Sequence, residues 1–198
     1  MVKRSNQVRI IAGQWRGRKL SFPDAHGLRP TPDRIRETLF NWLQPVLPGA
    51  RCLDLFAGSG ALGFEAASRG AAQVVMVDSA PGVVQALRDN AQKLAASTVH
   101  IDRQDAVDCL AGGAGPFDLV FLDPPFSSPE LLMKSLAGLS VPGRLAAGAW
   151  IYIETPSAVA EPPVPADWSR KKQKTAGQVA CRLYRCTDPL ARISHRVP

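Results

Sequence analysis

From residue 51 onward, short apolar runs alternate with stretches whose apolar residues recur at helical spacing, and this rhythm constrains the fold more than any other feature. Strands and helices in such regular succession form a parallel sheet wound by right-handed crossovers. The predicted strands are Cys52–Phe56, Val74–Val77, Val99–Ile101, Leu119–Leu122 and Ala149–Ile153. The predicted helices are Ala61–Arg69, Val83–Leu94, Ala106–Leu110 and Pro129–Leu139. We therefore expect an α/β fold with a mostly parallel sheet.

The C-terminal part departs from this rhythm. Two β-type segments, Trp168–Lys174 and Val179–Arg185, flank a short turn that contains Gly177. Their spacing predicts an antiparallel hairpin, which would complete a seven-stranded sheet.

The N-terminal part predicts a second hairpin and one helix. Residues 8–20 read as two short strands around glycine and polar residues. The helix is predicted to have Thr31 as its cap and Pro32 at its first position, and to continue through residues 34–43. We expect a single domain over residues 1–198, in which a basic hairpin extension (1–30) precedes the core (31–198).

A glycine-rich turn follows the first strand of the core. Gly58, Gly60 and Gly63 satisfy the spacing G-x-G-x-x-G, which is also found in dinucleotide-binding proteins. A pyrophosphate, however, needs free amides without a nearby anion. Asp54 stands just before these glycines, and its carboxylate suits a cationic ligand such as S-adenosylmethionine. The stretch D-x-F-A-G-S-G resembles motif I of class I methyltransferases, whose fold is Rossmann-like.

Two further acids follow the next two strands. Asp78 is predicted to bind both ribose hydroxyls and Asp105 the adenine amino group of the cofactor, although each could instead cap a helix. The complete predicted cofactor set is Asp54, Phe56, Ala57, Gly58, Ser59, Gly60, Asp78, Ser79, Asp105, Ala106 and Asp123.

The fourth strand runs directly into Asp123-Pro124-Pro125-Phe126. This loop resembles motif IV of amino methyltransferases that act on nucleic acid. Asp123 and the carbonyl of Pro124 can each accept one hydrogen of a base amino group and orient its lone pair. Pro125 restricts the loop, and Phe126 offers a flat face for stacking on the base. We predict these four residues as the catalytic loop.

Charge is unevenly distributed along the chain. Residues 1–36 carry a net charge of +7, residues 37–168 carry −7, and residues 169–198 carry +7. Two basic ends around an acidic body favour contact with a polyanion, although charged ends could serve solubility alone. Trp15 could stack on a base or pack in the core. The predicted nucleic-acid contacts are Arg9, Arg16, Arg18, Lys19, Arg29, Arg34, Arg36, Lys171 and Lys172, with Arg170 and Lys174 as further candidates.

Several of these segments together resemble the bacterial RsmD family. The resemblance lies in residues 9–20, 29–43 and 176–184, and in the two loops described above. It implies methyl transfer from S-adenosylmethionine to the N2 amino group of one guanine in small-subunit (16S) ribosomal RNA, within an assembling subunit. Relatives carry Glu-x-Asp after the second strand, whereas this chain has Asp78 and Ala80. One acid suffices for a ribose, so we expect cofactor binding to persist.

Other sequence features limit the alternatives. No Cys pair or His spacing predicts a metal site, and no apolar run is long enough to span a membrane. We expect a cytoplasmic monomer with reduced thiols. Three other functions remain open, namely an adenine-N6 methyltransferase, a non-enzymatic RNA-binding scaffold, and a dinucleotide-dependent oxidoreductase.

Overall fold

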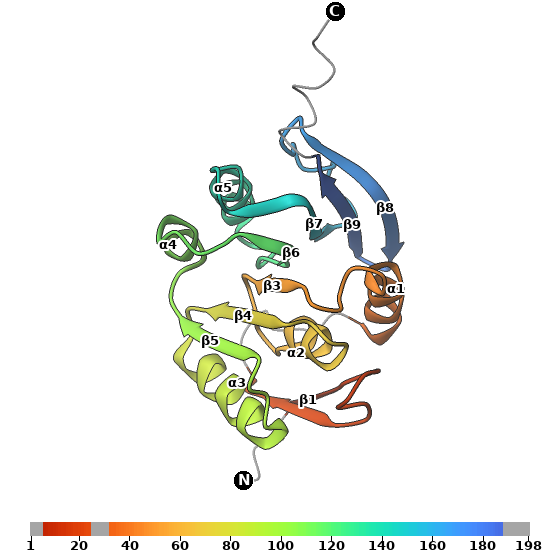
Figure 1. Ribbon diagram of the computed structural model, residues 1–198. Helices are drawn as coiled ribbons and strands as arrows, with labels where there is room; N and C mark the ends of the chain where they lie inside the picture. Colours follow the sequence, from red (N-terminus) through yellow and green to blue (C-terminus); the bar gives the residue numbers. More distant parts are fainter. Residues whose placement is uncertain (1–5, 25–31, 188–198) are drawn as a thin grey trace, which may run out of the picture.

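The computed structural model describes residues 6–24 and 32–187 of the 198-residue chain. Its main sheet has seven strands in the order β5-β4-β3-β6-β7-β9-β8. Strands β3 to β7 run parallel, and β9 lies antiparallel to both β7 and β8 (Figure 1). The strands are β3 (Arg51–Asp54), β4 (Gln73–Asp78), β5 (Val99–Arg103), β6 (Phe117–Leu122), β7 (Leu145–Pro156), β8 (Trp168–Ala176) and β9 (Val179–Cys186).

The predicted fold class is confirmed. A doubly wound, mostly parallel sheet ends in an antiparallel hairpin, and helices cover both faces. Most predicted element bounds are right to within a few residues, and β7 is longer than expected. The helices are α1 (Asp33–Leu43), α2 (Ala61–Ser68), α3 (Pro81–Leu94), α4 (Ala106–Ala111) and α5 (Pro129–Leu139).

Burial explains the pattern of the strands. The central strands β3 and β6 are covered on both faces, so they read as near-continuous apolar runs. The edge strand β8 is different, because it carries a run of exposed cationic residues that includes Lys171 and Lys172. Charged edge strands resist pairing with further chains.

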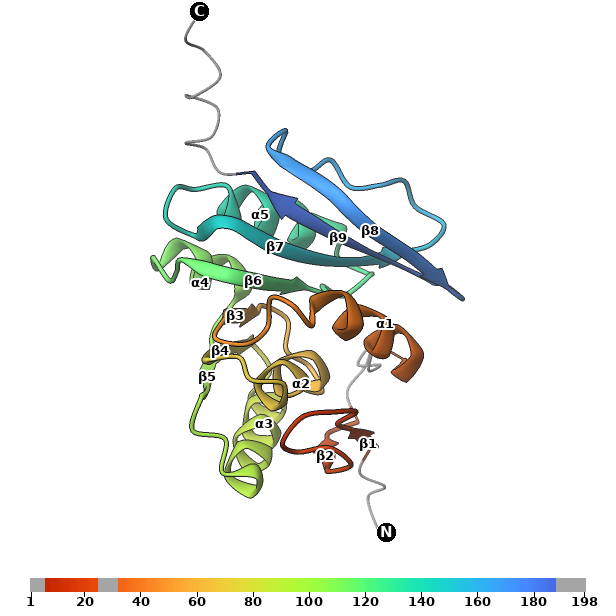
Figure 2. The ribbon, with the colours of Figure 1, turned by 45° about the vertical axis from the view of Figure 1, so that its right-hand side comes forward.

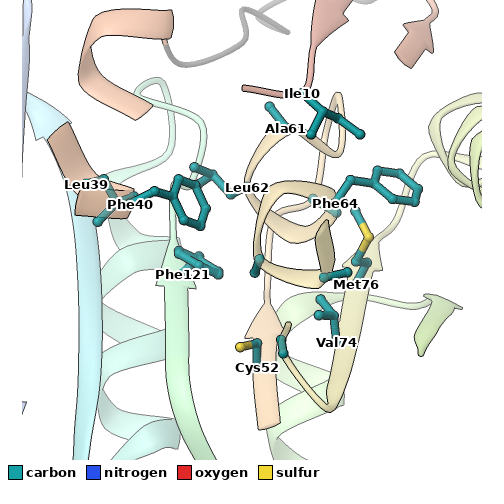
Figure 3. Close-up of a cluster of buried hydrophobic side chains, with 14 of the residues drawn as sticks. Ile10, Leu39, Phe40, Cys52, Ala61, Leu62, Phe64, Val74, Met76 and Phe121 are labelled. Carbon is teal, nitrogen blue, oxygen red and sulfur yellow. The ribbon is translucent and has the colours of Figure 1, made fainter. Parts of the chain in front are cut away.

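Two apolar clusters lie on opposite faces of the sheet. One face packs against α1, α2, α3 and the N-terminal hairpin, and the other against α4 and α5 (Figures 1 and 2). Phe40 of α1 contacts Phe121 of β6, with ring centroids 6.0 Å apart, and Figure 3 shows both within the first cluster. This contact packs helix α1 against β6.

The predicted N-terminal hairpin is present as a separate two-stranded sheet. Its strands, β1 (Asn6–Arg9) and β2 (Lys19–Phe22), pair antiparallel and lie beside α3 (Figure 2). Trp15, in the turn between them, is only 9% exposed and belongs to the core cluster. The structure thus favours core packing over base stacking for this indole.

Glu65 of α2 anchors the hairpin to the core. Its carboxylate is fully buried and accepts hydrogen bonds from the amides of Ile11 (2.7 Å) and Ala12 (3.0 Å). It also forms an ion pair with Arg69 at 2.7 Å and lies 3.8 Å from the guanidinium of Arg36. Such fully engaged buried charges specify one docking position, because removing one partner leaves the others unsatisfied.

A close backbone approach completes this anchor. Ser68 accepts a hydrogen bond from the amide of Trp15 at its hydroxyl and from that of Gln14 at its carbonyl. Gly13 adopts φ +82°, and a Cβ placed there would meet the carbonyl oxygen of Ser68 at 1.8 Å. Only glycine fits at this point.

The start of α1 differs from the prediction. Its cap residue is Pro32, with no side-chain hydrogen bond, so Pro32 precedes the helix instead of occupying its first position. The proposed cap Thr31 lies outside the described residues, as does Arg29. The four cysteines are free and buried, and no described helix is long and apolar enough to cross a membrane.

The approach of Gly13 to α2 yields a matched pair of substitutions. Gly13 and Gly17 have nearly the same φ (+82° and +81°), but nothing lies within 4 Å of a Cβ at Gly17. Gly17→Ala should lower the free energy of unfolding by about 1 kcal/mol, the cost of left-handed backbone. Gly13→Ala should cost about 3 kcal/mol or more, because the backbone of Ser68 must also move. Urea unfolding measures both, and equal losses would contradict the docking described above.

Candidate functional site

The predicted site residues meet at one edge of the sheet. Because β3, β4, β5 and β6 are parallel, their carboxyl ends face the same way, and the segments that follow them converge there. The structure thus brings together Asp54, the glycine-rich turn, Asp78 with Ser79, Asp105 with Ala106, and the Asp123–Phe126 loop.

The glycine-rich turn donates its amides to the protein itself. Gly58 N–H donates to Oδ2 of Asp78 at 3.0 Å, and Gly63 N–H to Oδ2 of Asp54 at 2.9 Å. The amide of Gly60 donates to the carbonyl of Ala57 at 2.7 Å. A pyrophosphate would need such amides for itself, so this turn is unsuited to a dinucleotide. The carboxylates of Asp78 and Asp54 instead hold the turn in place by accepting these hydrogen bonds.

Gly60 also satisfies a local steric demand. It caps α2 with φ +78°, and a Cβ there would lie 2.7 Å from side-chain atoms of Leu87 and Phe64. Ser59 is buried, whereas Phe56 is half-buried beside the turn. The glycine-rich turn is therefore both tightly packed and rich in carboxylate oxygen.

Asp54 is the most deeply placed of these acids. It is 2% exposed. Burial raises its pKa to about 7; the amide of Gly63 opposes this rise, and the negative charges of Asp78 and Glu154 add to it. A nearby cation would reverse the effect and favour the charged carboxylate. The site therefore fits a ligand that brings positive charge.

Asp78 and Asp105 use part of their acceptor capacity within the protein. Oδ1 of Asp78 accepts from the amide of Ala80 at 2.9 Å, yet the residue is only half-buried. Asp105 is exposed and caps α4 by accepting from the amide of Val107 at 2.7 Å. A carboxylate has about four lone-pair directions. Both acids can therefore also receive donors such as ribose hydroxyls or an amino group.

The predicted catalytic loop follows β6 at the same edge. Asp123 is half-buried and Pro124 is buried, whereas Pro125 and Phe126 are exposed. The amide of Ser128 donates to the carbonyl of Pro125 at 2.9 Å, which closes the turn before α5. Phe126 is 42% exposed, which is unusual for so large an apolar side chain. The loop thus offers an acceptor and a flat apolar face to an incoming ring.

Comparisons with known proteins agree with this architecture. The family described as conserved hypothetical protein 95 matches residues 8–185. Ribosomal RNA small subunit methyltransferase D of Escherichia coli is 51% identical over 180 residues, which cover 91% of this chain and 90% of that protein. Its counterpart in Haemophilus influenzae is 44% identical and covers 90% of this chain and 93% of its own length. The chain therefore belongs to the RsmD family.

A solved structure of a family member supports the same assignment. That of yhhF, a methyltransferase from Escherichia coli, superimposes with a TM-score of 0.85 at 49% identity, covering 92% of this chain and 99% of that one. The family resemblance predicted from the sequence is thus confirmed, and so is the Rossmann-like methyltransferase fold. The chain is a methyltransferase.

Most of the predicted RNA contacts of this methyltransferase fall into two exposed groups. Arg9, Arg16, Arg18 and Lys19 lie on or beside the hairpin, and Lys171 and Lys172 lie on β8. Helix α1 connects the two groups. Arg36 donates to the carbonyl of Arg9 at 3.0 Å, and Lys174 donates to the hydroxyl of Thr38 at 2.8 Å. Exposed Arg34 lies on the same helix.

Arg36 itself requires a correction. We predicted it as an RNA contact, but its side chain is only 1% exposed. It donates to Asp33 at 2.6 Å as well as to the carbonyl of Arg9, and it lies near Glu65. These contacts make Arg36 part of the docking of the hairpin, so it is unavailable to a phosphate.

Two important acids are not among the residues predicted from the sequence. Glu65 is the only acid in a helix whose eight residues are all buried, and this pattern alone could have indicated an internal partner. Glu154 follows an apolar strand, just as Asp123 does, and could have been included for that reason. No group of His, Cys, Asp and Glu that could hold a metal ion occurs within residues 6–24 and 32–187.

The raised pKa of Asp54 generates a prediction about the cofactor. If a cationic ligand binds near this carboxylate, it must displace a proton below pH 7, so its affinity should rise with pH and level off near the pKa of about 7. S-adenosylhomocysteine is the probe, titrated calorimetrically between about pH 5.5 and 7.5. Asp54→Asn should weaken binding about 10-fold or more and remove the pH dependence. A wild-type affinity that stays flat over this range would exclude contact between Asp54 and the cation.

Proposed function

We propose that this methyltransferase transfers a methyl group from S-adenosylmethionine to the exocyclic N2 amino group of a guanine in small-subunit (16S) ribosomal RNA. The observation that carries the proposal is the convergence of the acid-lined glycine turn and the Asp123–Phe126 loop at one edge of the sheet. Family membership supports the RNA substrate, since its relatives are named small-subunit ribosomal RNA methyltransferases.

The cofactor fits the donor set of the site. Asp54 would face its cationic part, Asp78 its ribose hydroxyls and Asp105 its adenine amino group, with Phe56, Ala57, Gly58, Ser59, Gly60, Ser79 and Ala106 forming the walls. When bound, S-adenosylmethionine supplies an electrophilic methyl group. The residues of the chain need only hold this donor and align the accepting amine.

Asp123 and Pro124 would carry out that alignment. A base amino group is a poor nucleophile because its lone pair is delocalised into the ring. Accepting its two hydrogens at Oδ of Asp123 and at the carbonyl of Pro124 turns the lone pair out of conjugation. The amino nitrogen so oriented could accept the methyl group that S-adenosylmethionine would supply, and Asp123 or water would take the N–H proton that is released. Phe126 would stack on the base.

The RNA backbone would be held away from this acidic edge. Phosphates are repelled by carboxylates, so binding must come from the exposed cations of the hairpin, α1 and β8. We further propose that the substrate is an assembling small subunit and that the protein acts as a cytoplasmic monomer. The target base must leave any stack or pair to reach Asp123.

Removing the Asp123 carboxylate tests the catalytic assignment. Asp123→Ala should lower kcat for methyl transfer to small ribosomal subunits by about 100-fold or more, because the acceptor that orients the amine is lost. Affinity for S-adenosylhomocysteine should stay within about 3-fold, and Asp89→Ala, an exposed acid on α3, should behave as wild type. Near-normal turnover by Asp123→Ala would eliminate this role.

Paired charge removals test the proposed RNA surface. Arg18→Ala with Lys19→Ala, or Lys171→Ala with Lys172→Ala, should weaken RNA binding at all sequences. Each pair should also reduce the slope of log K against log salt by about 2. Lys134→Ala on α5 is the control, since this exposed lysine lies on the opposite face of the sheet. Unchanged salt slopes would show that RNA binds elsewhere.

A further inference from the structure

Three neighbouring strands carry carboxyl side chains on one face at the catalytic edge. Asp54 of β3 pairs in register with Phe121 of β6, which pairs with Tyr152 of β7. The rings of Phe121 and Tyr152 meet edge to face with centroids 6.2 Å apart, so these two residues share a face. Side chains alternate along a strand, so Asp123 and Glu154, each two residues further on, point to that same face.

The register also indicates where Asp123 lies relative to Glu154. The last pair of β6 and β7 is Leu122 with Ile153, and continuing this register by one position would bring Asp123, the first loop residue, beside Glu154. Adjacent strands lie about 4.8 Å apart, which puts neighbouring side chains within contact range. The negative charge of Asp123 also adds to the rise in the pKa of Tyr152, as expected for a loop acid near this strand.

Glu154 is held firmly within the protein. It is 3% exposed, and the hydroxyl of Tyr152, itself 0% exposed, donates to its Oε1 at 2.7 Å. Burial, followed by the charge of Glu154, raises the pKa of Tyr152 well above its usual value, so this phenol stays protonated and remains a donor. A buried carboxyl with a fixed donor has little freedom to turn.

On the basis of the proposed function, we infer that Glu154 is a positioning residue for methyl transfer. Its carboxyl group, which is held by Tyr152, fixes the orientation and charge of Asp123. Ionisation of both of two adjacent carboxyl groups is unfavourable because their charges repel, so one proton is retained between them. The retained proton lets one acid donate to the other. Asp123 is thereby aimed at the amino group and stays ready to accept its hydrogens.

The groups that face this pair come from several elements. Asp54 faces it from β3, with Asp78 behind, and Cys181 pairs with Glu154 from β9. Tyr152 lies on the same strand, and Lys174 of β8 accepts from the Cys181 thiol at its carbonyl while its side chain donates to Thr38 of α1. Because burial raises the pKa of Asp54 to about 7, a pH effect on activity alone could come from Asp54. The Asp123 carboxyl must therefore be observed directly.

The direct test is a carbon-13 NMR titration of the Asp123 side-chain carboxyl in the full chain, assigned by its loss in Asp123→Asn. In the wild type this signal should shift in two steps separated by more than about one pH unit, because each acid reports the ionisation of the other. Glu154→Gln should leave a single step. Glu161→Gln is the control, since Glu161 also accepts from a tyrosine hydroxyl at 2.7 Å but lies 40% exposed beside Arg170. A single step in the wild type would overturn the inference.

Kinetics provide the second measurement. Glu154→Gln keeps a polar group and should hold kcat within about 3-fold, whereas Tyr152→Phe with Glu154→Leu removes both polar partners and should lower kcat by about 10-fold or more. The KM for RNA and the affinity for S-adenosylhomocysteine should not change in either. Equal kcat in both variants, or a parallel rise in KM, would reject a positioning role. An inactive wild type with a two-step titration would instead refute the proposed function and leave the pairing intact.

Discussion

Carboxylates accumulate at the single edge where the parallel strands end, and the rest of the site depends on how they are held there. Backbone amides of the glycine-rich turn donate to Asp54 and Asp78, the amide of Val107 donates to Asp105, and Tyr152 donates to Glu154. The edge is therefore rich in acceptors and poor in free amides. It suits a cofactor with cationic, hydroxyl and amino groups, and it repels phosphate.

Because this edge is acidic, the protein must bind the base and the phosphates of its substrate at different places. A base brings hydrogen-bond donors on its amino group, so it can approach the acidic edge, while its phosphates must be held elsewhere. The cations proposed to hold those phosphates are exposed residues of the hairpin, α1 and β8. Glu65 makes this arrangement rigid, because it fixes the hairpin against α2 immediately after the cofactor turn.

Much of this arrangement could be predicted from the sequence, because the relevant signals are local. The strand and helix rhythm, the glycine spacing and the Asp-Pro-Pro-Phe loop each lie within a few residues, and parallel strands bring their ends together by geometry. The predicted start of α1 is wrong by one residue, because the sequence alone does not distinguish Pro32 as the cap from Pro32 as the first helical residue. Arg36 was misassigned because burial depends on the hairpin packing over it.

The missed residues depend on long-range pairing. Glu65 finds its partners 53 and 54 residues away, and no local pattern says which amides those are. The placement of Glu154 beside Asp123 follows only from the order β6-β7 and its register. Ser68 likewise appears as an ordinary helix residue until the backbone of Gly13 is placed against it.

The measurement that tests the central claim most directly is methyl transfer to a defined base. Small ribosomal subunits from a strain lacking this protein are incubated with it and tritiated S-adenosylmethionine, and the labelled nucleoside is then identified by mass. The account predicts label in N2-methylguanosine. Label in N6-methyladenosine would contradict the base assignment, and no label in subunits or naked RNA would contradict catalysis on ribosomal RNA altogether.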